Sequence, residues 1–500
     1  MTAQAPRPEA LRPLAARVPP LALLGAGIAL TTLGELRWGV PALAWIAPVP
    51  FLLYLRARSG WRARLVLLGA VLVALHLQVA KIVTPPLSYA FVPAYAVPLA
   101  LVDGLVLVLA DALRRRASDR WGLYAFPAAT ALAEVACYRL SPAGTWGIAA
   151  NSQIGNLPLL QLAALLGPSA IGFLVAWTAS LAALLLASPA PRRFARDAAL
   201  LGAALVATPL LGAWRLAAHQ GRTVTVAGVV ADLGPTHAGF PDDAALAANT
   251  DALFARSERA AASGARVVVW NEAATVVRAA EEPAFLARGA ALARARGVDL
   301  VLAYAVPLSA APGAFENRYA WLSDQGELLE TYEKHHPVPG EGSVAGTAPL
   351  RALDRPYARA AGAICYDYDF PAMGLGHARL GAGLVVVPSS DWLGIDPFHT
   401  EMARLRAIEG GFSVVRPVRW ATSAAFDAYG RARATLPFFE ENDRILLATV
   451  PVEPVRTLYG RIGDSIALAY GAILLGALAA ALRARSGARD ATEVASREAA

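Results

Sequence analysis

Long apolar segments fill the first part of the chain, and one more lies near its C-terminus. Several of them approach the ~20 residues that a helix needs to cross a bilayer. The first, second and fifth are shorter or are interrupted by Pro and Gly. The pattern predicts eight membrane-spanning helices, at 18–34, 39–55, 64–80, 92–113, 121–138, 163–187, 198–217 and 464–482.

Between the seventh and eighth apolar segments, short apolar runs alternate with Ala-rich helical runs. We expect strands at 222–231, 267–270, 298–306, 318–323, 328–334, 360–365, 383–388, 412–418, 420–426 and 445–450. We expect helices at 243–262, 283–296, 370–380 and 398–410. The turn Asp324-Gln325-Gly326 predicts a hairpin between two of these strands. Strands that alternate with helices predict an α/β domain, and the hairpin makes its sheet mixed.

These patterns divide the chain into three parts. Residues 1–218 form a membrane domain of about seven helices, residues 219–455 form an α/β domain, and residues 456–500 hold the last helix and a polar tail. The predicted fold class is an α-helical membrane bundle of about eight spans joined to an α/β domain.

Arginines are distributed unevenly among the loops that join the apolar segments. Arginine clusters precede the first segment and follow the second, fourth, sixth and eighth. The alternate short loops contain only Arg37, Lys81 and Arg139. Because positively charged loops stay in the cytoplasm, both termini are predicted to be cytoplasmic and residues 219–455 to be exported.

Composition agrees with a membrane protein, since hydrophobic residues make up 56% of the chain and charged residues 17%. The net charge of +7 reflects the arginines that flank the apolar segments. A nucleic-acid site needs basic residues clustered on a soluble face, and the sequence shows none, so no nucleic-acid partner is expected. No Cys/His spacing typical of a metal site and no phosphate-binding loop is evident in the sequence, so neither a metal nor another cofactor is predicted.

Three polar residues each follow an apolar run of the α/β part. Glu272 follows the strand at 267–270, Lys334 ends the second strand of the hairpin, and Cys365 ends the strand at 360–365. Catalytic groups collect at strand ends in open α/β sheets. The sequence therefore favours one site that contains an acid, a lysine and a cysteine.

Lysine is rare in this chain, where Lys81 and Lys334 are the only lysines among 45 Lys and Arg residues. A lysine carries a compact charge whose pKa can be tuned, whereas arginine carries a planar, permanently charged fork. The presence of Lys334 in the exported part favours a site that needs an ammonium. The alternative is an ordinary surface lysine.

The chain has two cysteines, Cys137 and Cys365. Cys137 falls within the fifth apolar segment, so the two cannot easily meet in a disulfide. An unpaired cysteine in an exported domain favours a free reactive thiol, and Cys365 is the candidate nucleophile. The alternative is a buried structural thiol, which is common.

The chain order Glu272, Lys334, Cys365 resembles the catalytic triad of the nitrilase superfamily. Local motifs extend the resemblance to the apolipoprotein N-acyltransferase family. They are Trp146-Gly147-Ile148, Asn151-Ser152-Gln153-Ile154, Tyr332-Glu333-Lys334-His335-His336, Ile364-Cys365-Tyr366-Asp367 and Met402-Ala403-Arg404-Leu405-Arg406-Ala407-Ile408-Glu409. The resemblance implies seven spans, an exported nitrilase-like α-β-β-α sandwich and one final span.

Several motifs depart from the family's pattern. The family's Trp-Pro-Glu is Trp270-Asn271-Glu272 here, and the acid after Cys-Tyr is Asp367 and not Glu. The segment after Lys334 is one residue shorter, and a Ser-Asn-Asp-Ala-Trp-Phe-Gly pattern is shortened to Ser389-Ser390-Asp391-Trp392-Leu393-Gly394. The resemblance therefore defines the reaction class more closely than the substrate.

The resemblance implies an acyltransferase that works through a thioester. Cys365 would be the nucleophile, Glu272 the general base and acid, and Lys334 the residue that stabilises the oxyanion. The supporting residues that it implies are Glu341, Tyr366, Asp367 and Trp392. The alternative is a solvated loop acid for Glu341, local packing beside Cys365 for Tyr366 and Asp367, and a simple anchoring aromatic for Trp392.

The resemblance also implies the partners and the location. A membrane phospholipid would donate the acyl chain, and the N-terminal cysteine amine of a diacylated lipoprotein would accept it. We expect a monomer in the bacterial cytoplasmic (inner) membrane, with the catalytic domain on the periplasmic side. Two alternatives stay open: a membrane-tethered amidase that uses the same triad, and an inactive paralogue that acts as a scaffold.

Overall fold

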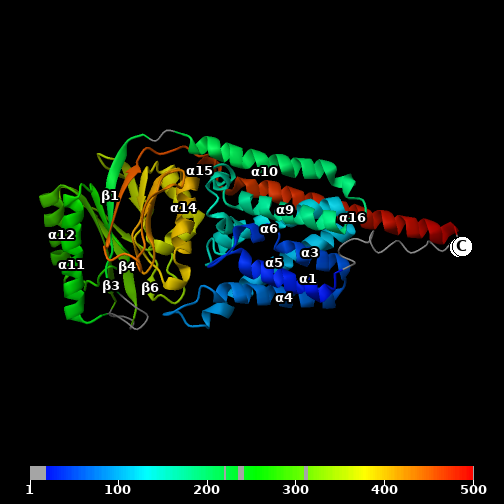
Figure 1. Cartoon of the computed structure of the whole chain (residues 1–500), viewed down its shortest axis with the longest axis horizontal. Coiled ribbons are helices and arrows are strands. Elements are labelled where there is room, and N and C mark those ends of the chain that lie inside the picture. Colours follow the sequence, from blue (N-terminus) through cyan, green and yellow to red (C-terminus); the bar gives the residue numbers. More distant parts are fainter. Residues whose placement is uncertain (1–17, 219–220, 235–240, 309–312, 499–500) are drawn as a thin grey trace.

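A computed structural model describes residues 18–218, 221–234, 241–308 and 313–498, with side chains through residue 486. Figure 1 shows a bundle of helices at one end of the molecule and a layered α/β domain at the other. The chain leaves the bundle after α10 (Ala195–Leu216) and returns to it before α16 (Ala467–Glu498). The α/β domain is therefore inserted between two long helices of the bundle.

Helices form at all the segments that were expected to cross the membrane. Besides α10 and α16, they are α1 (Pro20–Gly34), α2 (Pro41–Ala44), α3 (Pro48–Ala57), α4 (Trp61–Ala80), α5 (Phe91–Arg116), α6 (Asp119–Leu140), α8 (Ala163–Leu166) and α9 (Ser169–Ala187). In the described part of the chain, five helices are long and apolar enough to span a bilayer: Trp61–Ala80, Phe91–Arg116, Ser169–Ala187, Pro191–Leu216 and Leu458–Ser486. The first two expected spans fall on the shorter apolar helices Pro20–Gly34 and Pro41–Ala57. The fifth falls on α6, whose interior contains Pro127 and the buried Glu134.

The helices α10 and α16 run along one edge of the bundle (Figure 1). In the most apolar stretch of each helix, 11% is buried for α10 and 17% for α16, compared with 61% for α9. The side chains that α10 exposes include Leu200, Val206, Leu210 and Trp214. An apolar surface of this extent is unfavourable in water, and it indicates a lipid-facing edge.

Two β-sheets form the centre of the α/β domain. The first sheet has the order β15-β1-β2-β3-β4-β5, with β6 paired to β4, and the second has the order β14-β13-β11-β9-β8-β7. The strands of the first sheet are β1 (Thr223–Val229), β2 (Val267–Trp270), β3 (Asp299–Pro307), β4 (Phe315–Leu322), β5 (Leu328–Glu333), β6 (Ser343–Val344) and β15 (Ile445–Pro451). Those of the second are β7 (Leu353–Asp354), β8 (Arg359–Gly362), β9 (Leu384–Val386), β11 (Ser413–Arg416), β13 (Ser423–Phe426) and β14 (Ala432–Leu436). A short parallel pair, β10 (Ser389–Ser390) with β12 (Val418–Arg419), extends beyond the second sheet.

Buried side chains define four layers. The facing sides of the two sheets share one apolar core, which includes Val267, Val301, Val386 and Val415. The outer face of the first sheet packs on α11 (Asp243–Ala262) and α12 (Glu282–Arg296) through a second core. The second sheet packs on α13 (Pro371–Arg379) and α14 (Phe398–Gly410). The domain is therefore an α-β-β-α sandwich.

The helix α14 also joins the sandwich to the membrane bundle. Its residues Leu405 and Ile408 belong to a buried cluster with Leu159, Leu160 and Ala163 of the bundle. Figure 1 shows α14 facing the bundle, with α11 and α12 on the far side of the sandwich. The second sheet and the residues that follow its strands are therefore the part of the sandwich nearest the membrane.

Most predicted elements of the α/β domain form, including the hairpin, since β4 and β5 pair as antiparallel strands. The strand expected at 360–365 is shorter, because β8 ends at Gly362 and Cys365 begins the 3-10 turn η5 (Cys365–Asp369). Cys365 itself has a φ of +47°, which a strand residue does not adopt. The chain turns here because Asp367 accepts a hydrogen bond from the Ile364 N–H at 3.0 Å and closes the turn.

Candidate active site

Glu272, Lys334 and Cys365 follow strands of two different sheets. Glu272 comes after β2 and Lys334 directly after β5 in the first sheet, whereas Cys365 comes after β8 in the facing sheet. All three are buried, with exposed fractions of 3%, 1% and 3%. The sandwich therefore brings together an acid, a lysine and a thiol that lie far apart in the sequence.

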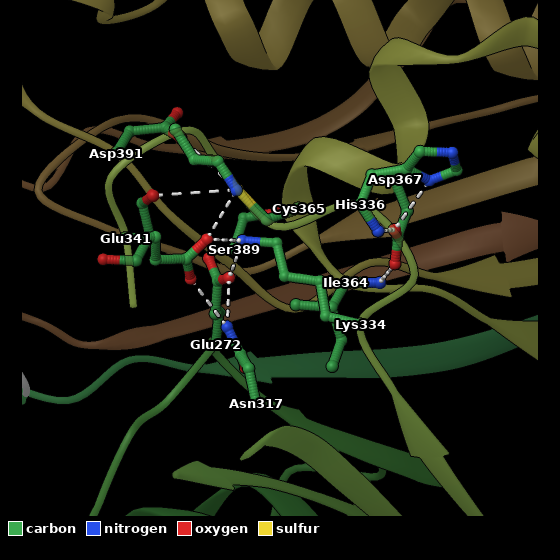
Figure 2. A network of polar contacts seen from close by, with 12 residues as sticks. Glu272, Asn317, Lys334, His336, Glu341, Ile364, Cys365, Asp367, Ser389 and Asp391 are labelled. Atoms are coloured by element: carbon green, nitrogen blue, oxygen red, sulfur yellow. Dashed lines mark hydrogen bonds and ion pairs between the residues drawn. The ribbon is translucent and has the colours of Figure 1, made fainter. Parts of the chain in front are cut away.

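Lys334 is the centre of a buried group of ion pairs (Figure 2). Its Nζ lies 2.7 Å from Glu272 Oε1 and 2.7 Å from Glu341 Oε2. Asn317, on β4, donates from Nδ2 to both carboxylates, at 2.8 Å to Glu272 and 3.0 Å to Glu341. The Val338 N–H donates to Glu341 Oε2 at 2.8 Å and fixes the loop that carries this acid. Glu341, one of the expected supporting residues, thus lies within hydrogen-bond distance of the lysine.

The two carboxylates keep Lys334 protonated. Burial acts to lower the pKa of its ammonium, but the charges of Glu272 and Glu341 raise this pKa well above the usual 10.5. A charge that stays fixed beside the thiol needs no reorganisation when a negative oxygen develops nearby. Lys334 can therefore stabilise an oxyanion at any physiological pH.

The pKa values of the thiol and of its neighbouring acid are both raised. Burial, together with the charge of Glu272, raises the pKa of Cys365 well above the usual 9.0. Burial also raises the pKa of Glu272 above 4.5, although Lys334 and a hydrogen bond with Cys365 oppose this effect. Cys365 is thus a neutral thiol at physiological pH, and it needs a base before it can attack. A carboxylate whose pKa is raised toward the operating pH is a more effective general base for this proton than an ordinary carboxylate.

Asp367 fastens the turn that carries Cys365. Its carboxylate accepts hydrogen bonds from the His336 N–H at 2.7 Å, the Tyr332 hydroxyl at 2.8 Å and the Ile364 N–H at 3.0 Å. In Figure 2, Asp367 lies on the other side of Cys365 from the ion pairs of Lys334. Asp367 therefore ties the segment after Lys334 to the turn and holds the strained backbone at Cys365 in place.

Two of the expected supporting residues contact the membrane bundle. The hydroxyl of Tyr366 donates to the carbonyl of Pro142, in the segment after α6. The indole Nε1 of Trp392 donates to the carbonyl of Ile82, in the segment after α4, at 2.7 Å. The shortened loop at Trp392 therefore still spans the distance to the bundle.

A cavity of about 220 Å³ opens beside the thiol, and both parts of the protein line it. Glu272, Lys334 and Cys365 form part of one wall. The opposite wall is largely apolar and comes from α4, α5 and the segment between them, with Leu75, Val79, Leu87, Phe91 and Leu99 among its residues. A mostly apolar cavity with a few convergent polar groups is typical of a ligand site.

A second buried polar group lies beside the thiol. Cys365 Sγ is 3.9 Å from Asp391 Oδ1 and 3.9 Å from Arg416 Nη2. Arg416 donates to both oxygens of Asp391 at 3.0 Å, and His399 contacts the same carboxylate at 2.8 Å. Donor atoms of Cys365, Asp391 and His399 lie within 4.8 Å of one another, a spacing that could hold a metal ion. The guanidinium of Arg416 already provides the positive charge at this position and would repel such an ion.

The sequence did not reveal four further residues beside the thiol and the lysine, which are Asn317, Asp391, His399 and Arg416. Asn317 occupies an inward-facing position of β4, next to the inward-facing Tyr319 and Trp321. Arg416 ends the otherwise apolar run of β11. A polar residue inside an apolar run is the signal that points to these positions, and it does not reveal which partner each one meets.

Residues 215–459, which contain the sandwich and its buried Glu-Lys-Cys group, match the family model for carbon-nitrogen hydrolases. Residues 26–181 match the family model for the apolipoprotein N-acyltransferase N-terminal domain. The chain belongs to the apolipoprotein N-acyltransferase family.

Curated relatives match long stretches of the chain. An apolipoprotein N-acyltransferase of Bradyrhizobium diazoefficiens is 32% identical over 354 residues, which cover 62% of this chain and 64% of the relative. One of Geobacter metallireducens is 26% identical over 480 residues, which cover 88% of this chain and 91% of the relative. Among solved structures, an amidase from Nesterenkonia sp. is 22% identical, with a TM-score of 0.39, over 47% of this chain and 94% of the amidase.

Proposed function

We propose that this protein transfers a fatty acyl chain from a membrane phospholipid, through a thioester on Cys365, to the N-terminal cysteine amine of a diacylated lipoprotein. The observation that carries the proposal is the cavity between the buried Glu-Lys-Cys group and the apolar helices α4 and α5. Exposure of an acyl chain to water is unfavourable. A chain that enters along these helices reaches the thiol without such exposure. Family membership supports the same donor and acceptor.

The first half-reaction forms the thioester. Glu272 takes the proton of the Cys365 thiol while Sγ attacks the ester carbonyl of the phospholipid. Lys334 and the backbone N–H of Tyr366 stabilise the negative oxygen of the tetrahedral intermediate. The ester C–O bond then breaks, Glu272 returns its proton to the departing alkoxide, and a lysophospholipid leaves.

The second half-reaction passes the acyl chain to the acceptor. The free amine attacks the thioester carbonyl, Glu272 takes a proton from the nitrogen, and Lys334 again stabilises the oxyanion. The C–S bond breaks, the sulfur recovers the proton from Glu272, and an amide is released. Glu341 contacts Lys334 and the Val338 N–H, so its role is to hold the lysine and the loop that faces the acceptor.

The proposed topology has eight crossings, with both termini in the cytoplasm. It divides the chain into a membrane domain (1–218), an exported catalytic domain (219–455), and a final helix with its tail (456–500). The arginine clusters at alternate loops support this orientation. The catalytic cavity then opens at the outer surface of a bacterial cytoplasmic membrane, where phospholipid and lipoprotein meet. The single chain supplies both walls of the cavity, which agrees with a monomer.

Reporter fusions test this topology. A reporter fused after Ala218 is expected to lie on the exported side of the membrane. A reporter fused after Arg485 is expected to lie in the cytoplasm. The reason is that seven crossings precede the first junction and eight precede the second. An alkaline phosphatase and a fluorescent protein at each junction provide the measurement and its control. A cytoplasmic readout after Ala218 would contradict the number of crossings.

A transfer assay tests the proposed function. The full-length protein is supplied with phospholipid that carries a labelled acyl chain and with a diacylated lipopeptide. We expect labelled N-acyl lipopeptide and lysophospholipid in equal amounts, because one acyl chain leaves the donor for each amide formed. Labelled free fatty acid with unchanged lipopeptide would indicate a membrane-tethered hydrolase. Neither product from folded protein would indicate a scaffold.

A further inference from the structure

A segment of the membrane bundle holds the turn that follows Cys365. Thr145, in the segment after α6, donates from its N–H and from its hydroxyl to the carbonyl of Asp369, each at 2.9 Å. Trp146 donates from Nε1 to Asp369 Oδ2 at 2.7 Å. Gly144 has a φ of +55°, and a Cβ on it would lie 2.9 Å from the Asp369 carbonyl oxygen. Both the main chain and the side chain of Asp369 are therefore fixed by the bundle.

His399 continues this contact toward the nucleophile. Its Nε2 lies 2.8 Å from Asp369 Oδ1, and its Nδ1 lies 2.8 Å from Asp391 Oδ1. The side chain is buried at the start of α14, with Trp146 packed against its ring at 5.5 Å between centroids. Asp391 in turn lies 3.9 Å from Cys365 Sγ. An unbroken series of polar contacts thus joins the bundle segment to the thiol.

The environment of His399 favours the imidazolium. Burial acts to lower its pKa, but the carboxylates of Asp369 and Asp391 raise it, against the opposing charge of Arg416, from 6.5 to about 9. A neutral imidazole could donate to one carboxylate only and would turn a lone pair toward the other. The imidazolium donates to both carboxylates. Arg416 Nη2 lies 2.9 Å from His399 Nδ1 and donates to the same Asp391 oxygen that His399 contacts.

We propose that Trp146, Asp369, His399 and Asp391 form a positioning relay that couples the docking of the membrane bundle to the placement of the Cys365 thiol. The relay keeps the Asp391 carboxylate and the Arg416 guanidinium at fixed distances from Sγ, and so sets the electrostatic field in which the thiol loses its proton. The proposal deepens the proposed function, because it makes the reactivity of the thiol depend on the part of the chain that delivers lipid. None of the four residues is assigned a bond-forming step.

Two rate measurements test the relay in a Cys137→Ala background, in which Cys365 is the remaining cysteine. The first is alkylation of Cys365 by iodoacetamide without lipid, and the second is acylation by phospholipid alone, both followed by intact-protein mass. Trp146→Phe removes one donor to Asp369 and keeps an aromatic ring. We expect both rates to fall about 10-fold, the size expected for loss of one hydrogen bond to a charged group. Because alkylation uses no lipid, it tests the relay even if the protein transfers no acyl chain.

The matched control is Trp45→Phe. Trp45 donates from Nε1 to Gln153 Oε1 at 2.9 Å. Gln153 lies in the same bundle segment as Trp146, but this hydrogen bond is not part of the relay. We expect both rates to stay within two-fold of the parent, about the size of a side-chain change remote from the site. If Trp146→Phe behaves like this control, or if acylation slows while alkylation does not, the bundle does not act on the thiol and the relay is wrong.

The pH dependence tests His399 directly. The imidazolium contributes fully below pH 6.5, and its contribution is lost as pH rises through about 9. The rate of acylation by phospholipid alone should therefore decline near pH 9. Cys365 and Lys334 stay protonated at that pH, because the pKa of each is raised well above its usual value. In His399→Gln this decline should vanish and the rate should be low throughout. A decline near pH 9 that persists in folded His399→Gln would overturn the relay, and Trp146→Phe decides the question if the glutamine variant does not fold.

Discussion

Replacing Cys365 by serine is expected to abolish acyl transfer and to leave the protein folded and inserted in the membrane. The rate should fall at least about 10⁴-fold, since removal of a nucleophile usually disables the whole catalytic group. A hydroxyl keeps the small size of the thiol at a position where the backbone φ is +47°. It is a far weaker nucleophile than a thiol, however, and a carboxylate base cannot readily deprotonate it. Mass spectrometry of lysophospholipid and N-acylated lipopeptide gives the rate.

The matched control is Cys137→Ser. Cys137 lies on α6 and is only partly buried, and it is not among the residues that line the cavity beside Cys365. This variant should transfer acyl chains at the rate of the parent. Transfer at the normal rate by Cys365→Ser, with membrane insertion unchanged, would mean that Cys365 is a buried structural thiol.

Replacing Glu272 by glutamine is expected to slow formation of the thioester by about 10²–10⁴-fold, the range that positioned proton transfer contributes. The amide is nearly the same size and can still accept a hydrogen bond from Lys334. It cannot take the proton of a thiol whose pKa is raised well above 9.0. Incubation with phospholipid alone, followed by intact-protein mass at successive times, measures this half-reaction separately from the second.

The comparison variant is Glu341→Gln. Glu341 bonds the same ammonium, at 2.7 Å, but its side chain is more exposed, at 19% compared with 4% for Glu272. We expect a milder loss, with a thioester that forms and accumulates because the acceptor loop is disturbed. Equal losses in the two variants, or normal thioester formation by Glu272→Gln, would show that Glu272 is not the base. The raised pKa of Glu272 also predicts that acylation by the parent declines on acidification at a pH above 4.5.

The membrane helices and the order of the α/β elements follow from local patterns that the sequence displays directly. Apolar segments of about 20 residues mark the long helices, and alternation of short apolar runs with helical runs marks the sandwich. The hairpin at β4 and β5 has its own turn signal. Glu272, Lys334 and Cys365 could be selected because each follows an apolar run and because lysine and cysteine are so rare in this chain.

The rest of the site depends on contacts across the two sheets and between the sandwich and the bundle. His399 gains its two carboxylate partners only when α14 packs on η5, which carries Asp369, and beside Asp391, which follows β10. Asn317 meets Glu272 because β4 lies two strands from β2 in the first sheet. The turn at Cys365 depends on Asp367, whose partners include residues about thirty positions earlier in the chain. Sequence periodicity carries no information about such long-range partners.

The proposed function requires that Cys365 carry the acyl chain between a lipid and an amine. The most direct test adds phospholipid to the full-length protein without acceptor, records the intact mass, and then adds a diacylated lipopeptide. We predict a mass increase of one acyl chain that localises to Cys365, is absent in Cys365→Ser, and disappears as N-acyl lipopeptide forms. An adduct that clears in water equally fast with or without lipopeptide would contradict the transferase and favour a hydrolase. Normal transfer by folded protein that never shows an adduct would contradict the thioester mechanism.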